Sequence, residues 1–321
     1  MTKISIVIPV YGVEKYIAAT IRTICAQTFR DFELILVDDG SPDASIKVAE
    51  EELSGQNVAY RVIRQDNRGA ASARNIGIAA AKGEWVICID SDDGMHPQAL
   101  GILERVIRKC PEDVSVIGVD FQVVKDFGGL DNTLDEDPAF KVYSKYELSD
   151  EFLLRKIKLI APGLLIRKSW FDAERIMYDE NIRFSEDQFF VWTILSHAEK
   201  ICFINEKLYW YVTRSNSTMT SSGRERIMTG YAAFHQLDEK AKNDAVDFGK
   251  NQNLIFPRWI IGVLHAVSKY MDYNEFEKLA DAFKYRDYMK ELYHFPDARV
   301  KLLARLIICN KRIFYMIAKL L

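Results

Sequence analysis

The chain has 321 residues, of which 49% are hydrophobic, 28% charged and 12% aromatic. This composition excludes a disordered, collagenous or low-complexity protein and leaves enough apolar material for one large domain or two smaller ones. Lysine and arginine number 43 against 46 acidic residues, giving a formal net charge of −3. We therefore expect no nucleic-acid partner, because bulk charge would not hold one.

Cysteine usage and the apolar runs bear on the cellular compartment. The five cysteines form no CxxC pair, and such sparse usage favours a reducing, cytoplasmic environment. The apolar run at residues 4–8 is too short for a secretory signal and is typical of a strand. No stretch reaches the roughly 18 apolar residues that a membrane-spanning helix needs.

The first 120 residues alternate short apolar runs with stretches of helical periodicity. Strands are predicted at 4–8, 33–37, 58–63, 85–89 and 114–119, and helices at 13–26, from about 45, at 70–81 and after Pro97. This alternation predicts a parallel sheet with helices on both faces. Residues 121–220 are irregular in pattern, residues 223–321 are mostly helical, and a polar stretch near 220 marks the predicted boundary.

Polar residues follow each of the first four predicted strands. They include Tyr11 after the first, Asp39 after the second, Asn67 after the third, and Asp90 and Asp92 after the fourth. In open α/β sheets, ligands bind outside the carboxyl ends of the strands. The sequence therefore predicts a ligand site at this edge of the sheet.

Helix capping is the alternative explanation for these acidic residues. It could account for Asp38 and Asp39, but one cap does not require the three carboxylates of Asp90, Asp92 and Asp93. Three neighbouring carboxylates repel one another unless a cation lies among them. A hard divalent cation, bound through carboxylates and substrate phosphates, would remove that repulsion.

Motifs of several other enzyme classes are absent. The chain has no GxxxxGK[ST], no GxGxxG after the first strand, no HExxH and no GxSxG. Without a glycine cradle, phosphate would be neutralised by a metal ion and by Arg68 or Arg74. A serine hydrolase is not supported.

Three segments together resemble those of inverting family 2 glycosyltransferases with the GT-A fold: ISIVIPVYG, FELILVDDGSPD and NRGAASARNIGIAAAKGEWVICIDSDD. The resemblance is close over residues 3–110 and weaker to about 220. It implies an α/β, Rossmann-like GT-A fold, with a mostly parallel sheet, helices on both faces and a C-terminal helical region. The GT-A domain would span 1–220, with a nucleotide-sugar half to about 120 and an acceptor half from about 121, followed by the helical region 221–321.

The resemblance also implies roles for residues at the predicted edge. Pro9 and Tyr11 would flank the nucleotide base, and Asp39 would accept a hydrogen bond from the uracil or the ribose. Asn67 and Arg74 would lie near the base and the phosphates.

Asp90 and Asp92 match the DxD motif of the family. By resemblance, Asp90 would point toward the ribose or the sugar, and Asp92 would bind the Mn²⁺ or Mg²⁺ ion that bridges the diphosphate. Arg214 and Ser217 match a later segment of the family that approaches the diphosphate.

The sequence Phe184-Ser-Glu186-Asp187 resembles the ED motif of the family, in which the aspartate is the catalytic base. That residue would be Asp187. An alternative remains, because Ser185 and Gln188 also spell a capping box and acidic residues favour a first helical turn. Glu186 would have a positioning role.

The sequence departs from the family pattern at two places. Gly12 stands where the family often has asparagine, and residues 161–166 lack the usual acceptor-side stretch. The QxxRW motif of processive enzymes is also absent, which predicts the transfer of one sugar per binding event. The implied function is metal-dependent, inverting transfer from a nucleotide-sugar, with UDP expected, to a glycan or lipid-linked acceptor in bacterial surface polysaccharide synthesis. The alternatives are a sugar nucleotidyltransferase and a non-catalytic nucleotide-binding module.

The last 24 residues contain no acidic side chain. At about 100° per residue, Lys301, Arg305, Arg312 and Lys319 fall on one stripe of a single helix. A basic stripe beside an apolar face predicts an interfacial helix of 298–321 on an anionic membrane, at the cytoplasmic face. Packing within a helical bundle, or a contact in a homo-oligomer, is the alternative.

Overall fold

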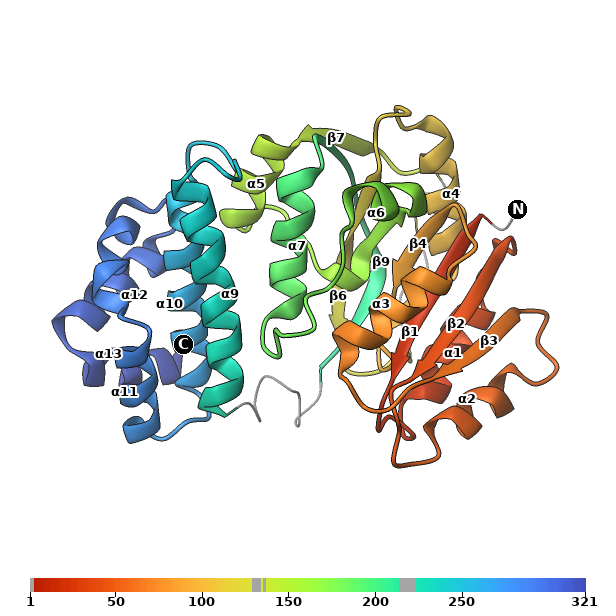
Figure 1. Cartoon of the computed structure of the whole chain (residues 1–321), viewed down its shortest axis with the longest axis horizontal. Coiled ribbons are helices and arrows are strands. Elements are labelled where there is room, and N and C mark those ends of the chain that lie inside the picture. Colours follow the sequence, from red (N-terminus) through yellow and green to blue (C-terminus); the bar gives the residue numbers. More distant parts are fainter. Residues whose placement is uncertain (1–2, 129–133, 135–136, 214–222) are drawn as a thin grey trace. The chain divides into compact units, whose positions relative to one another are not determined.

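The computed structural model describes residues 3–128, 134, 137–213 and 223–321 (Figure 1). Contacts between residues divide the chain into two units. Unit 1 comprises residues 1–145, 158–180 and 186–214, and unit 2 comprises 146–157, 181–185 and 215–321. The predicted domain boundary near 220 stays a prediction, because unit 2 also takes in two short segments that precede it.

Four parallel strands form one half of the sheet in unit 1, in the order β3-β2-β1-β4. Their bounds are β1 Ile4–Val10, β2 Phe32–Asp38, β3 Ala59–Arg64 and β4 Trp85–Cys88. The intervening helices are α1 Ile17–Cys25, α2 Ser45–Leu53, α3 Ala70–Ala80 and α4 Ala99–Lys109. The predicted alternation of strands and helices is confirmed here, because strands buried on both faces leave near-continuous apolar runs in the sequence.

Strand β1 shows how the sheet is covered on both faces. Ile6 and Ile8 belong to the core cluster that includes Ile17 and Ile21 of α1. Val7 points to the opposite face and meets α3, where a Cβ on Gly77 would lie 2.2 Å from Val7 Cγ1. Glycine at this position therefore allows α3 to approach the strand closely.

The other half of the sheet is mixed. Strand β8 (Leu164–Arg167) lies between β4 and β6 (Val116–Val124) and is antiparallel to both. Because β8 is antiparallel to both neighbours, β6 runs in the same direction as β1 to β4. The strand predicted at 114–119 therefore closes the parallel series, but it pairs with β8 and not with β4. Strand β9 (Lys200–Val212) runs parallel to β6, and β5 (Gly94–Met95) and β7 (Phe140–Ser144) are antiparallel to β9. The described residues of unit 1 also contain helices α6 (Lys168–Glu174) and α7 (Glu186–His197) and the short η1 (Ala161–Gly163).

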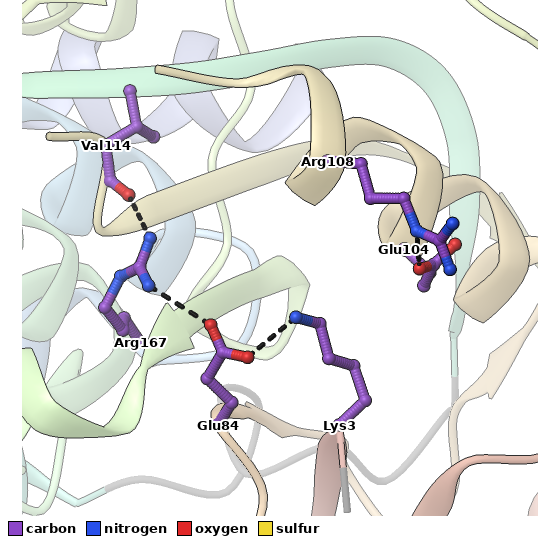
Figure 2. A network of polar contacts seen from close by, with 6 residues as sticks. All are labelled: Lys3, Glu84, Glu104, Arg108, Val114 and Arg167. Atoms are coloured by element: carbon purple, nitrogen blue, oxygen red, sulfur yellow. Dashed lines mark hydrogen bonds and ion pairs between the residues drawn. The ribbon is translucent and has the colours of Figure 1, made fainter. Parts of the chain in front are cut away.

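A polar network fastens the inserted strand β8 to its neighbours (Figure 2). The Glu84 carboxylate pairs with Lys3 Nζ at 2.7 Å and with Arg167 Nη1 at 3.2 Å. Arg167 also donates to the Val114 carbonyl and lies 4.6 Å above the ring of Trp85. The Arg167 guanidinium thus links β8 with the starts of β4 and β6, and Glu84 extends the network to Lys3 before β1. Arg108 and Glu104 pair separately within α4.

Unit 2 is helical, as predicted for residues 223–321. It contains most of α5 (Lys145–Leu153), together with α9 Arg224–Lys242, α10 Ile255–Val267, α11 Tyr273–Ala282, α12 Ala298–Cys309 and α13 Lys311–Leu320. The short helices η2 (Gln252–Leu254), η3 (Tyr285–Asp287) and η4 (Met289–His294) connect them. No helix in the described ranges is both long and apolar enough to cross a bilayer.

The prediction of one basic stripe on a single C-terminal helix is wrong. Asn310 has extended backbone angles and its side chain accepts hydrogen bonds from the amides of Arg312 and Ile313. It therefore ends α12 and caps α13. Lys301 and Arg305 lie on the first helix, and Arg312 and Lys319 on the second.

Candidate active site

The first feature of the site is a buried carboxylate at the end of β2. Asp39 is 2% exposed and accepts hydrogen bonds from Gln65 Nε2 at 2.6 Å and from the amides of Arg68 and Gly69 at 2.8 and 2.9 Å. A carboxylate has about four acceptor positions, so Asp39 organises the loop before α3 and keeps room for one further donor. Its predicted contact with a uracil or ribose stays a prediction.

Pro9, Tyr11 and Asn67 are the other residues predicted to be near the base. Pro9 is buried in β1 opposite Val37, whereas the side chains of Tyr11 and Asn67 are exposed. Gly12 has φ 65, a left-handed conformation that glycine adopts freely and asparagine adopts more often than other residues. This backbone angle explains why the glycine can replace the asparagine of the family pattern.

Arg74 of α3 connects the sheet edge with the start of α7. Its guanidinium is 4% exposed and lies 2.7 Å from Asp90 Oδ1, 3.3 Å from Asp187 Oδ1 and 3.8 Å from Glu186 Oε1. Burial lowers its pKa, but the charges of Asp187 and Asp90 outweigh this effect and raise the pKa well above the usual value. Arg74 is therefore a permanent cation that joins the two predicted acidic motifs.

Aromatic and hydrogen-bond contacts hold the Arg74 side chain in place. The guanidinium lies 5.1 Å from the ring centre of Tyr178, and that ring stacks on Phe190 of α7. Asn75, the next residue of α3, donates to the Tyr178 carbonyl and accepts from the Tyr178 amide, both at 2.9 Å. Sequence reasoning missed Asn75 and Tyr178, since neither belongs to an acidic motif.

Asp187 has the properties of a group that exchanges protons near neutral pH. Burial raises its pKa to about 7; Arg74 opposes this, while Glu186 and Asp90 add to it. Its Oδ1 atom is shielded from solvent, although 39% of the side chain is exposed. One oxygen is thus held against Arg74 while the group stays accessible, as a general base requires.

The alternative role of Asp187 as part of a helix start is only partly consistent with the backbone. Helix α7 does begin at Glu186, where the dipole favours acidic residues. However, Ser185 has φ 60, whereas an N-cap residue typically lies in the extended region. The predicted capping box of Ser185 and Gln188 therefore lacks the usual N-cap conformation.

Two of the three carboxylates after β4 have different partners. Asp90 pairs with Arg74, whereas Asp93 is 2% exposed and accepts hydrogen bonds from Tyr209 Oη at 2.6 Å and the Val212 amide at 2.7 Å. Burial, followed by the charge of Asp90, raises the pKa of Asp93 to about 7. The predicted repulsion thus persists between Asp90 and Asp93, and a divalent cation among these carboxylates stays a prediction. Asp93 also connects the segment after β4 with β9, a role that sequence reasoning missed.

Asp92 lies between these two residues and is half-buried. In the described ranges, no three His, Cys, Asp or Glu side chains are grouped to hold a metal ion by themselves. Mg²⁺ does not require such a group, because it commonly binds through one or two carboxylates together with substrate phosphates. Asp92 fits that chemistry. Arg214 and Ser217 lie outside the described residues.

Comparison with known proteins identifies the family. A model of the family "Glycosyl transferase family 2" matches residues 5–171, just over half of the chain. The chain is 29% identical to the glycosyltransferase GlyG of Streptococcus pneumoniae, over 92% of this chain and 96% of that protein. It is 26% identical to the poly(ribitol-phosphate) beta-N-acetylglucosaminyltransferase TarS of Staphylococcus aureus, over 69% of this chain and 37% of TarS.

Solved structures are similar over almost the whole chain. TarS residues 1–349 in complex with UDP-GlcNAc has a TM-score of 0.57 at 18% identity, covering 99% of this chain and 90% of that one. The mannosyltransferase PcManGT of Pyrobaculum calidifontis, in complex with GDP-Man and Mn²⁺, has a TM-score of 0.55 at 15% identity, covering 99% and 85%. The family match and the shared architecture establish that the chain belongs to glycosyltransferase family 2 and has the GT-A fold.

Proposed function

We propose that this glycosyltransferase moves a single sugar, with inversion at the anomeric carbon, from a UDP-sugar to a hydroxyl group of a glycan or lipid-linked acceptor in bacterial surface polysaccharide synthesis. The observation that carries the proposal is the accessible carboxylate of Asp187, held beside Arg74 with a pKa of about 7. The names of similar proteins support the donor and the acceptor class, since TarS acts on poly(ribitol-phosphate) and was solved with UDP-GlcNAc.

Inverting transfer is a single displacement in which the acceptor hydroxyl attacks the anomeric carbon from the side opposite to the diphosphate. The hydroxyl must lose its proton as it attacks. We assign that proton to Asp187, since a carboxylate within hydrogen-bond reach contributes about 10²–10⁴-fold to such a step. Arg74 fixes the orientation of Asp187 through its Nη1 atom, 3.3 Å from Asp187 Oδ1.

The donor would bind at the carboxyl ends of β1, β2 and β4. In this proposal Pro9, Tyr11 and Asn67 contact the base, Asp39 accepts one hydrogen bond from it or from the ribose, and Asp90 faces the ribose or the sugar. Arg74, Arg214 and Ser217 act near the diphosphate.

Asp92 is the proposed protein ligand of a Mn²⁺ or Mg²⁺ ion. Such an ion, when bound, supplies Lewis-acid stabilisation of the leaving diphosphate. The Mn²⁺ in the PcManGT complex supports this choice of cofactor.

The function is tested by measuring UDP release from a panel of UDP-sugars, with Mn²⁺ or with EDTA. We expect release from one donor with Mn²⁺ and none with EDTA. Calorimetry should show that Asp92→Ala abolishes Mn²⁺-dependent donor binding. Asp113→Ala, at an exposed position that pairs with Lys200, should leave donor binding unchanged. Unchanged donor affinity in Asp92→Ala would refute the metal assignment.

We further propose that the enzyme works on an anionic membrane surface, at the cytoplasmic face, through α12 and α13. Leu302, Ile313 and Met316 are 51%, 41% and 52% exposed, and no acidic residue follows Asp297. Exposed apolar side chains with neighbouring cations suit the headgroup region of such a membrane. A membrane location would bring the enzyme to a lipid-linked acceptor.

A further inference from the structure

Unit 2 contains four basic side chains that the proposed reaction does not use. Arg258 and His265 belong to α10, Lys269 follows in the next turn, and Arg155 comes from the segment after α5. We call these four residues the basic cluster. At about 100° per residue, positions 258, 265 and 269 fall on one narrow stripe, and most other side chains of α10 are buried in the core of unit 2.

A glycine, which has no side chain, lies at the centre of the stripe. Gly262 lies between Arg258 and His265, and a Cβ at this position would be 3.3 Å from Arg258 Nη1. The guanidinium therefore lies along the helix over Gly262, one turn from His265. On another side, Arg258 lies 6.0 Å from the ring centre of Phe295, near the outer limit of a cation–π contact.

The members of the basic cluster repel one another. Burial, followed by the charge of Arg155, lowers the pKa of Arg258 to about 10, although the charge of Asp297 opposes both effects. Burial also lowers the pKa of His265, and the charges of Lys269, Arg155 and Arg258 lower it as well. A main-chain interaction with Ala318 raises this pKa and partly opposes them. Positive charge is thus gathered here at a cost in folding free energy.

The basic cluster has no ion-pair partner among the described residues. In the parts of the chain that the structure describes, no carboxylate forms an ion pair with any of the four side chains. Arg258 Nε and His265 Nε2 are buried without a hydrogen-bond partner. Asp297, whose charge Arg258 senses, uses its Oδ1 for the first amides of α12.

Stabilisation of α10 does not account for this arrangement. His265 and Lys269 lie near the carboxyl end of the helix, where the dipole favours cations. Arg258, however, lies near the amino end, where the dipole disfavours a cation, and Arg155 is not part of α10. The two arginines therefore need another explanation.

We infer that the basic cluster is a binding site for a phosphate-bearing ligand. A guanidinium presents paired donors that match phosphate oxygens, and the unsatisfied nitrogens of Arg258 and His265 would both gain an acceptor. In an enzyme with the proposed function, the ligand is the phosphate part of the acceptor, and this clause rests on that function. Two sources share the chemistry: the diphosphate of a lipid-linked acceptor and the phosphodiester of a polyol-phosphate polymer.

The test follows the proton on His265 in the full chain by NMR. The His265 Cε1–H resonance is assigned by its loss in His265→Gln, and its titration is recorded alone, with inorganic pyrophosphate, and with glycerophosphoglycerol as a phosphodiester. We expect the pKa to lie below the usual histidine value alone and to rise with one of the probes, because a bound anion stabilises the imidazolium. The probe that acts at the lower concentration identifies the source. Sodium chloride at matched ionic strength controls for screening.

Two variants make the result specific. Arg258→Gln should raise the pKa of His265 without any probe, because a neighbouring positive charge is removed, and should abolish the further rise. Arg286→Gln, which removes an exposed arginine of unit 2, should keep the full response. The inference is overturned if neither probe moves the titration, or if Arg258→Gln responds like the unchanged protein. No donor or transfer reaction enters this experiment, so failure of the proposed function would leave its outcome interpretable.

Discussion

At the residue scale, the pKa of Asp187 predicts how activity depends on pH. A base must be unprotonated, and burial raises the pKa of this carboxyl to about 7. We therefore expect kcat/KM, which reports the free enzyme, to fall as the pH drops below about 7. Asp187→Asn should lower transfer by about 10²–10⁴-fold while donor affinity is kept. Near-normal turnover in Asp187→Asn would exclude it as the base.

The neighbouring Glu186 provides a matched control for this prediction. The charge of Glu186 raises the pKa of Asp187, so Glu186→Gln should move the acidic limb of the kcat/KM profile to lower pH and keep most of the maximal rate. A profile that does not move would mean that another group controls the limb.

The acidic residues of the site could be predicted from the sequence only in part. Asp39 and Asp90 follow buried strands, so the sequence predicts that they lie at one edge of the sheet. The sequence does not predict where each side chain points. Asp93 turns toward Tyr209, more than a hundred residues later, and nothing in the local pattern distinguishes it from Asp92. The cation beside Asp90 is Arg74 of α3, whose proximity depends on the close packing at Gly77.

At the element scale, the contact between α3 and the segment before α7 should be a large local source of stability. Asn75→Ala removes two hydrogen bonds with the Tyr178 main chain and a third, longer one with Glu180, and it leaves the amide and carbonyl of Tyr178 unsatisfied. We expect the free energy of unfolding of unit 1 to fall by about 2–4 kcal/mol in urea. Asn253→Ala, which removes one exposed contact with Glu291, should change stability by less than about 0.5 kcal/mol. Equal effects of the two variants would contradict the role given to Asn75.

The elements themselves were predictable where their apolar pattern is long. Helices α1 to α4 and strands β1 to β4 follow the predicted periodicities closely. Strand β8 has only four residues, too few for any period to show, and its antiparallel insertion depends on partners distant in sequence. The division of 298–321 into α12 and α13 was missed because Asn310 lies within a basic pattern that continues across it.

At the scale of the whole molecule, charge is distributed unevenly along a chain that is close to neutral. The net charge is −3, although residues 298–321 carry six basic side chains and no acidic one. The rest of the chain is therefore strongly acidic and would be repelled by an anionic bilayer. Only a segment with concentrated positive charge and exposed apolar side chains can overcome this repulsion, which favours α12 and α13 as the contact.

Flotation with vesicles tests this membrane contact in the full chain. We expect binding to phosphatidylglycerol vesicles and none to neutral ones, with loss at high salt. Arg312→Gln should weaken binding about fivefold, because each basic residue near the surface contributes about 1 kcal/mol. Met316→Glu should weaken it more, since it removes apolar area and adds a negative charge, whereas Val123→Glu, at an equally exposed position of unit 1, should have no effect. Flotation that Met316→Glu leaves intact would exclude α13 as the contact. Absent flotation combined with dimers that Met316→Glu dissociates would assign the same stripe to a second copy of the chain.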